Sequence, residues 1–435
     1  MLGLWMSKSA RTKDKPNGKR KERGADGFPH WALRMFFSVD MVGSTAYKHA
    51  SLPTSPEPKR RRLASKPDLP GPHWLPTFAE FYSAFSEELD QAWQVGLRQV
   101  QAAGDRAIPI GQGKKPEFWK SAGDELLFHC LVTSPSHAGF CLDAFRLAII
   151  NYRAKLAKAN RRLNLKATAW LAGFPVNNIE VVVGAEPDWL RELTPALADD
   201  HITRMLLRTR NKLNGSKNDS GQLEFIGPQM DLGFRLAAHA TPRHMVISAD
   251  LVYLLVENHL DSYGFQVNHY KTESASEAIR LDGSHPLKGI LGGTPYPIFW
   301  IDCDPNELNK AEDRMLDPQR LGKGDIKDYC EAFFRACGER WMVRPFIWDQ
   351  AAGKAVCGSE PEGHDEVRKG YCSYLEGRER ALESKLADDS GGDRADRPEK
   401  ISERLQAAAS RGAKSEVGHP KGQGELPSGS PPSEE

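Results

Sequence analysis

Apolar residues recur through the middle of the chain with two different periods, and these predict an alternation of strands and helices. Short apolar or alternating runs indicate strands near 31–39, 165–174, 179–183, 223–226, 245–248, 265–270 and 296–301, with a strand–turn–strand unit at 118–130. Apolar repeats at helical spacing indicate helices near 75–102, 136–161, 189–206, 228–239, 249–257, 305–316 and 326–342. This order predicts an α+β fold in which helices pack on one mainly antiparallel sheet.

Polar stretches that lack an apolar period indicate where the folded parts of the chain begin and end. We expect the basic N-terminus and the charged C-terminal tail to be disordered, and we interpret two internal polar stretches as insertions. The expected parts are a disordered segment at 1–28, a folded domain at 29–303 with insertions near 52–72 and 185–221, a helical extension at 304–386 and a disordered tail at 387–435.

Composition adds an expected cellular compartment. Apolar residues make up 40% of the 435 residues, which is enough for a core. The seven cysteines are scattered and form no C-x-x-C pair, which argues for a reducing compartment and against disulfides or a structural zinc site. We find no secretory signal and no run near the ~18 apolar residues of a membrane span. We therefore expect a cytoplasmic protein with no membrane partner.

The net charge of +1 is distributed unevenly, with basic runs near the N-terminus and at 59–62. Such runs can contact nucleic acid, but more often they are solvated segments. We therefore expect no nucleic-acid partner.

The first candidate chemistry lies where the apolar run 35–39 meets Asp40. A short loop follows at once, and its Gly and hydroxyl residues expose backbone N–H groups that can bind phosphate. The loop residues in question are Val42, Gly43, Ser44 and Thr45. In isolation, such a segment is more often a strand that ends in an Asx turn.

A second carboxylate, Asp124, stands in a predicted hairpin turn after Gly123. Mg²⁺ and Mn²⁺ prefer oxygen ligands and leave positions for phosphate oxygens and water. Asp40 and Asp124 on separate strands would meet that need, so we predict a divalent-metal site that holds a nucleoside triphosphate.

Four segments of the chain resemble segments that occur in the same order in class III nucleotide cyclases. Their residues are most similar to those of the pyrimidine cyclases of Pycsar antiphage systems. They are FFSVDMVGSTAYK at 36–48, FWKSAGDELLF at 118–128, ATAWLAGFPVNN at 167–178 and EFIGPQMDLGFRL at 224–236. The resemblance covers roughly 31–303. It implies a ferredoxin-like core, a homodimer with composite active sites, and conversion of UTP or CTP to the 3′,5′-cyclic monophosphate, with UTP favoured.

The resemblance also implies roles for individual residues. Two Mn²⁺ or Mg²⁺ ions would be held by Asp40, Asp124 and the backbone carbonyl of Met41. Arg235 would stabilise the transition state. The family has Asn where this chain has Asp231, which would bind the ribose or orient Arg235. The remaining implied substrate contacts are Lys288 for phosphate and Lys120 and Glu224 for the base.

Lys120 and Glu224 could satisfy the hydrogen-bonding edge of either a purine or a pyrimidine, so base choice has to come from the size of the site. We predict that the bulky side chains of Phe36, Tyr47 and Trp119 restrict the site to a single ring.

The expected function is a lyase whose product activates a separate effector in antiphage defence. One alternative is a class III adenylate or guanylate cyclase. A diguanylate cyclase is disfavoured because Ala122 stands where a second glycine would precede Gly123. The alternative from another class is a nucleotide- or nucleic-acid-binding module without catalysis.

Overall fold

The chain divides into two compact units. Unit 1 comprises residues 1–180 and 225–369, and unit 2 comprises 181–224 and 370–435. The computed structural model describes residues 32–49, 72, 74–103, 113–159, 162–175, 177–188, 190–191, 200–213, 219–257, 266–267, 270–271, 278–304, 306–316, 322–338, 344–349, 353–360 and 363–389. The predicted disordered N-terminus, the Pro-rich insertion up to residue 71 and the tail beyond 389 lie outside these residues.

A seven-stranded sheet in the order β10-β11-β7-β4-β1-β3-β2 is the framework of unit 1. Its strands are β1 (Ala32–Val42), β2 (Glu117–Ala122), β3 (Glu125–Leu131), β4 (Asn164–Phe174), β7 (His244–Ile247), β10 (Ile279–His285) and β11 (Tyr296–Asp302). Every pairing is antiparallel except that of β4 with β7. The α+β prediction with a mainly antiparallel sheet is therefore confirmed.

The first four strands are connected as β1-α2-β2-β3-α3-β4 and lie in the order β4-β1-β3-β2. This is the connectivity of the ferredoxin-like βαββαβ motif. It makes β1 the central strand, paired with β3 on one side and with β4 on the other.

Side chains along β1 alternate between the two faces of the sheet, as the pleat of a strand requires. Met35, Phe37 and Val39 point into the main core and are fully buried. The rings of Phe37 and Phe145 stack at 4.5 Å between centroids, which attaches helix α3 (Pro135–Ala159) to this face. Helix α2 (Leu75–Ala103) joins the same core through Phe85, whose ring lies 5.4 Å from that of Phe145.

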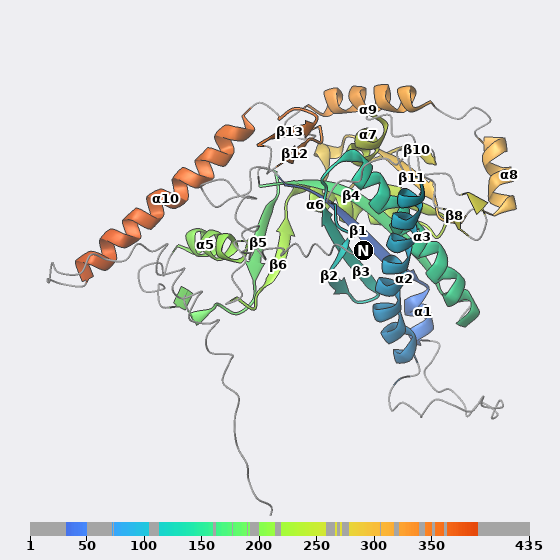
Figure 1. The fold of residues 1–435 in the computed structure, drawn as a ribbon, viewed down its shortest axis with the longest axis horizontal. Coiled ribbons are helices and arrows are strands. Elements are labelled where there is room, and N and C mark those ends of the chain that lie inside the picture. The colour runs from blue at the N-terminus through green and yellow to red at the C-terminus, as the bar shows by residue number, and fades with distance from the viewer. Residues whose placement is uncertain are drawn as a thin grey trace, which may run out of the picture. The chain divides into compact units, whose positions relative to one another are not determined.

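Figure 1 shows the other helices of unit 1 around this sheet. Helix α7 (Ala249–Glu257) packs with α9 (Lys323–Cys337), and α6 (Pro228–Leu236) packs on β4. The remaining elements are α1 (Ser44–His49), the 3₁₀ turns η2 (Ala237–His239) and η3 (Leu291–Gly293), α8 (Glu307–Leu316), the two-residue strands β8 (Gln266–Val267) and β9 (Tyr270–Lys271), and the pair β12 (Ile347–Asp349) and β13 (Lys354–Cys357). No helix among the described residues is long and apolar enough to span a lipid bilayer.

Most predicted elements are present, but several differ. The strands β12 and β13 were not predicted, because the extension at 304–386 was expected to be helical. Strand β1 continues two residues beyond Asp40, because Asp40 pairs with both neighbouring strands. Two paired strands of two residues, β8 and β9, occur where one strand was expected near 265–270. Strand β10 was not predicted, because its sequence IRLDGSH does not alternate and its register is broken by a bulge.

Helix α10 (His364–Asp389) was also not predicted as an element of its own, because no apolar period marks it. It carries the i,i+4 ion pair of Lys369 with Asp365 at 2.5 Å. Pairs of this kind support a helix with little apolar surface.

Unit 2 contains most of β5 (Ile179–Val183) and β6 (Gln222–Ile226), which pair with each other, together with α5 (His201–Leu213). The helix expected at 189–206 is described at 190–191 and as α5, which continues to residue 213. Arg208 forms two hydrogen bonds with the buried carboxylate of Asp219, at 2.5 and 2.7 Å. Arg208 also donates to the carbonyl groups of Gly184 and Ala185. This network connects α5 to Gly184, Ala185 and Asp219.

Asp250 is a fully buried carboxylate at the start of α7. It accepts hydrogen bonds from the Ser248 hydroxyl and the Leu251 backbone N–H. Burial nevertheless raises its pKa from 3.8 to about 6.

We predict that Asp250 makes the fold less stable as pH rises through about 6. A raised folded pKa means that the native state binds more protons, so this contribution is complete below the unfolded pKa and is lost above the folded one. In urea unfolding at pH 4 and pH 7.5, Asp250→Asn should remove roughly 3 kcal/mol of this pH dependence. The exposed Asp90→Asn is the control, and equal pH profiles for Asp250→Asn and the wild type would contradict the prediction.

Candidate active site

Three charged side chains form a row across the sheet on the face opposite the main core. Asp40 of β1 is paired directly with Glu125 of β3 and with Lys166 of β4. Directly paired residues point to the same face of a sheet. The Lys166 ammonium lies 3.2 Å from the Asp40 carboxylate, and both side chains are partly exposed.

Asp124 is held beside this row by contacts from three elements. The Met41 backbone N–H donates to the Asp124 carbonyl oxygen at 3.2 Å. The Ser44 hydroxyl donates to the Asp124 carboxylate, and the Tyr82 hydroxyl of α2 donates to the Gly123 carbonyl. Gly123 has a φ of 69°, which suits the first loop position of a tight hairpin turn. The sheet and the turn therefore bring Asp40 and Asp124 to the same end of β1 and β3.

The loop after β1 is a single turn centred on Gly43. Gly43 has a φ of 85°, and a Cβ there would lie 2.7 Å from the Arg162 carbonyl oxygen, so only glycine fits. Helix α1 begins at the next residue, Ser44, which is buried while Thr45 is exposed. From this helix, Lys48 approaches the Asp124 carboxylate at 3.9 Å, and the Tyr47 hydroxyl lies 3.2 Å from that of Thr77.

A cleft of about 190 Å³ opens next to Asp40. It is lined by Ser38, Asp40, Glu125, Lys166, Ala167, Thr168, Ala237, Ala238 and Ala240. Ala237 and Ala238 belong to η2 and Ala240 follows it, so the segment directly after α6 forms one wall. None of the predicted residues Lys120, Asp231, Arg235 and Lys288 is among the described residues that line the cleft.

Burial is the main reason that the pKa of Glu125 is raised. The nearby charges of Asp40 and Asp124 raise it further, while the Ser38 hydroxyl and the Lys166 charge oppose the shift. The site thus gathers three acidic groups and compensates them with two lysines, Lys48 and Lys166. This concentration of carboxylates is typical of a site that binds a cation.

The donor set at this end of the sheet suits a hard divalent cation, because Asp40 and Asp124 offer carboxylate oxygens from two rigid, linked elements. The acidic groups do not bring three ligand atoms within 4.8 Å of one another in the described part of the chain. Two carboxylates leave the other coordination positions to substrate oxygens and water, as Mg²⁺ sites commonly do.

Aromatic rings fill the sheet face beyond the charged row. The Phe36 ring is fully buried and lies 5.5 Å from Trp170, 5.8 Å from Trp119 and 4.9 Å from Phe225. The Lys120 ammonium lies over the ring of Trp119 at 4.1 Å. Glu224, the other predicted base-reading residue, belongs to unit 2 and is half-buried.

Helix α6 carries Asp231 and Arg235 one turn apart, and both side chains are exposed. No ion pair joins the two among the described residues of this helix, so an orienting contact from Asp231 to Arg235 is absent here. Lys288 is also exposed, in the turn after β10. The predicted transition-state and phosphate residues thus lie on the surface of the single chain.

Three residues around Asp40 were not predicted as site residues: Ser38, Glu125 and Lys166. All three side chains lie on the same face of the sheet as Asp40. Ser38 is two residues before Asp40 on β1, and Glu125 and Lys166 are the residues that pair with Asp40 on β3 and β4. That register was not known from the sequence, so only the alternation around Asp40 could have indicated Ser38.

Comparisons with known proteins give low similarities to nucleotide cyclases. No family model matches the chain, and no curated protein matches it. The adenylyl cyclase CyaB from P. aeruginosa is 10% identical with a TM-score of 0.34, covering 64% of this chain and 96% of its own. The guanylate cyclase domain of RhGC from Catenaria anguillulae, solved with GTP, is 11% identical with a TM-score of 0.32, covering 62% and 96%.

The guanylyl cyclase Cya2 is 12% identical with a TM-score of 0.30, covering 64% of this chain and 94% of its own. Similarity at this level does not establish an activity. The case for nucleotide chemistry therefore depends on the side chains described above.

Gly233 permits the close approach of α6 to the sheet, because an added Cβ would overlap the ring of Trp170. We predict that Gly233→Ala pushes α6 away from β4 and lowers the free energy of unfolding by about 1–3 kcal/mol. The matched control is Gly324→Ala in α9, where a Cβ meets no atom within 4 Å. Equal unfolding midpoints in urea for the two variants would show that the contact of α6 with Trp170 is not tight.

Proposed function

We propose that this protein is a class III nucleotide cyclase of the pyrimidine branch, which converts UTP, or alternatively CTP, to the 3′,5′-cyclic monophosphate and pyrophosphate. The main support is that Asp40 and Asp124 lie on two elements joined by the Met41 N–H bond, beside a cleft on the sheet face opposite the main core. The product would activate a separate effector in antiphage immunity, and this last part rests on the sequence resemblance alone.

The reaction needs groups that position the triphosphate more than groups that react covalently. Asp40, Asp124 and the Met41 carbonyl would hold two Mn²⁺ or Mg²⁺ ions, which supply acidification of the ribose 3′-hydroxyl and neutralisation of the phosphates. The Ser44 hydroxyl keeps Asp124 in place for this role. The 3′-hydroxyl loses its proton to water, its oxygen attacks the α-phosphorus, the bond from that phosphorus to the oxygen of the β-phosphate breaks, and pyrophosphate leaves.

Cationic and N–H groups of the chain would bind the phosphates and the transition state. The turn at 42–45 offers backbone N–H groups, and Lys288 offers an ammonium for the phosphates. Arg235 is always protonated and can donate two hydrogen bonds, so it suits the charge that grows on the α-phosphoryl group. Asp231 can only accept hydrogen bonds when ionised, which suits a ribose hydroxyl.

Aromatic crowding supports the preference for a single-ring base. Trp119 is packed against Phe36 and Phe225, and Lys120 lies over the Trp119 ring, so the neighbourhood of this base-reading lysine is already filled. A two-ring base would need more room beside Lys120 than a pyrimidine does. Tyr47, bonded to Thr77, is a further bulky group on the side of the phosphate turn.

A homodimer with composite sites would explain why Asp231, Arg235 and Lys288 are exposed and do not line the cleft beside Asp40. Each chain would give its two aspartates to one site and its α6 residues to the other. Phe234 of α6 is 41% exposed, which is apolar area that a second chain could cover.

The direct test is to incubate the purified chain with UTP, CTP, ATP or GTP and Mn²⁺ or Mg²⁺ and to identify the products by mass. We expect cyclic UMP, or cyclic CMP, to be the main product and to disappear with chelator. Asp40→Asn and Asp124→Asn should each lower the rate at least about a hundredfold.

The control is Asp188→Asn, because this aspartate side chain is 93% exposed and lies in unit 2. Cyclic AMP or cyclic GMP as the main product would reject the pyrimidine preference but keep the cyclase reaction. Tight nucleotide binding with no product under any condition would favour a binding module and contradict the proposal.

Composite sites predict complementation between two inactive chains. Asp40→Ala and Arg235→Ala should each be inactive alone, yet mixed dimers should recover about a quarter to a half of wild-type activity, since one of their two sites is intact. Differently tagged chains, co-purified through both tags, provide proven mixed dimers. If such dimers stay inactive while tagged wild-type dimers are active, each site is built from one chain.

A further inference from the structure

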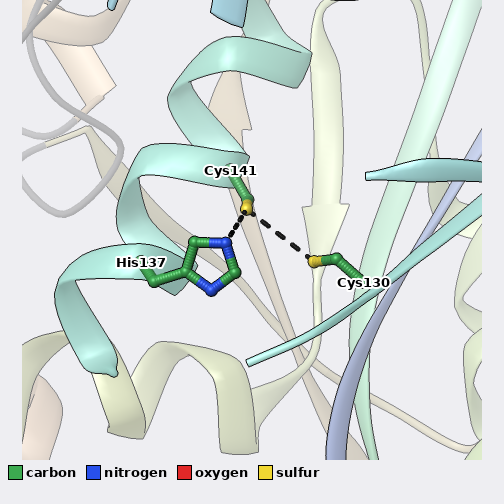
Figure 2. A group of neighbouring side chains, drawn as sticks. All are labelled: Cys130, His137 and Cys141. Atoms are coloured by element: carbon green, nitrogen blue, oxygen red, sulfur yellow. Dashed lines mark hydrogen bonds between the residues drawn. The ribbon is translucent and has the colours of Figure 1, made fainter. Parts of the chain in front are cut away.

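A cluster of three side chains in unit 1 has no part in the proposed reaction. Cys130 lies near the end of β3, and His137 and Cys141 lie one turn apart at the start of α3 (Figure 2). All three are buried, at 4%, 0% and 0% exposure. Their ligand atoms lie within 4.8 Å of one another, and they form the only such group among the described residues.

We propose that Cys130, His137 and Cys141 bind a structural Zn²⁺ ion, independently of the proposed cyclase activity. The two sulfur atoms are 3.7 Å apart, and the Cys141 sulfur lies 3.2 Å from Nε2 of His137. Tetrahedral zinc with Zn–S bonds of about 2.3 Å and Zn–N bonds of about 2.0 Å has a sulfur–sulfur edge of about 3.8 Å and a sulfur–nitrogen edge of about 3.5 Å. The side chains therefore already stand close to the positions of zinc ligands.

The backbone carbonyl of Lys114 is the fourth ligand in this proposal. Its oxygen lies 2.8 Å from Nε2 of His137 and 3.9 Å from the Cys141 sulfur, so it faces the same point as the side chains. Gly113 makes this approach possible, because a Cβ at that position would overlap the His137 ring.

Charge also favours zinc at this buried position. Two thiolates and a neutral imidazole cancel the charge of Zn²⁺, so the filled site carries no net charge into the core. Without the ion, burial raises the pKa of the Cys141 thiol and lowers that of His137, so both groups are then neutral.

Binding requires a defined movement of protons. Nδ1 of His137 accepts a hydrogen bond from the Thr133 N–H at 3.3 Å, so Nε2 carries the ring proton and donates it toward Lys114. When Nε2 binds zinc, the ring proton moves to Nδ1, the Thr133 bond is given up, and the two thiol protons leave to solvent. The exchange is Zn²⁺ for two protons, without any change of oxidation state.

Such an ion would connect three parts of the fold that support the Asp124 hairpin. Cys130 lies at the end of β3 opposite to Asp124, Lys114 lies in the segment that leads into β2, and the other ligands belong to α3. The ion would therefore fix both strands of the hairpin to the helix behind them. Its role is structural, and it is distinct from the ions proposed at Asp40 and Asp124.

The test measures zinc content in full-length protein in which Asp40→Asn and Asp124→Asn remove the proposed catalytic ligands. After equilibration with Zn²⁺ and removal of free metal, inductively coupled plasma mass spectrometry should find about one zinc per chain. Adding Cys141→Ser or His137→Gln should lower the zinc content at least about tenfold. Cys303→Ser, at another buried cysteine, is the matched control and should keep the zinc.

A second measurement does not depend on how well the variants fold. In the otherwise unchanged chain, Co²⁺ should give a thiolate-to-metal charge-transfer band and the visible bands of tetrahedral cobalt, and Zn²⁺ should abolish both. The proposal is overturned if the chain binds no zinc, if Cys141→Ser and His137→Gln retain it, or if the freshly isolated chain contains a Cys130–Cys141 disulfide. Because activity is not read out, failure here leaves the proposed cyclase function untouched.

Discussion

The alternation of side chains along β1 is the constraint on which the rest of unit 1 depends. One face of this central strand is fixed in the main core by Met35, Phe37 and Val39. A slip of one residue would move Phe37 to the opposite face of the sheet and Asp40 into the main core. The burial of the apolar face therefore fixes the orientation of Asp40, and the register with β3 and β4 then sets Glu125 and Lys166 beside it.

Each of the other elements adds one restraint to this strand. The hairpin of β2 and β3 brings Asp124 to the end of β1 where Asp40 lies, and the Tyr82 hydroxyl of α2 holds the tip of its turn. Helix α6 packs on β4, where Gly233 lies against the ring of Trp170. The site is consequently made rigid by the same contacts that stabilise the fold, which suits chemistry based on positioning.

Local signals in the sequence were sufficient for much of the fold and for the two candidate metal ligands. Asp40 follows an apolar strand and Asp124 occupies a Gly-Asp turn, and both patterns lie within a few residues. Lys166 and Glu125 could not be found in this way, because their nearness to Asp40 arises from strand register between distant segments. The same holds for Cys130 and Cys141, whose spacing fits no zinc motif although their sulfur atoms lie 3.7 Å apart.

The ion pair of Asp40 with Lys166 gives the site an internal counter-ion. Without it, the carboxylates of Asp40, Asp124 and Glu125 would repel one another whenever no external cation is bound. Any cation that binds Asp40 competes with this ammonium, but a pair in partial contact with solvent is worth no more than about 1 kcal/mol, or roughly fivefold in affinity. Lys166 therefore balances part of the negative charge around Asp40, and a divalent ion can displace it at little cost in free energy.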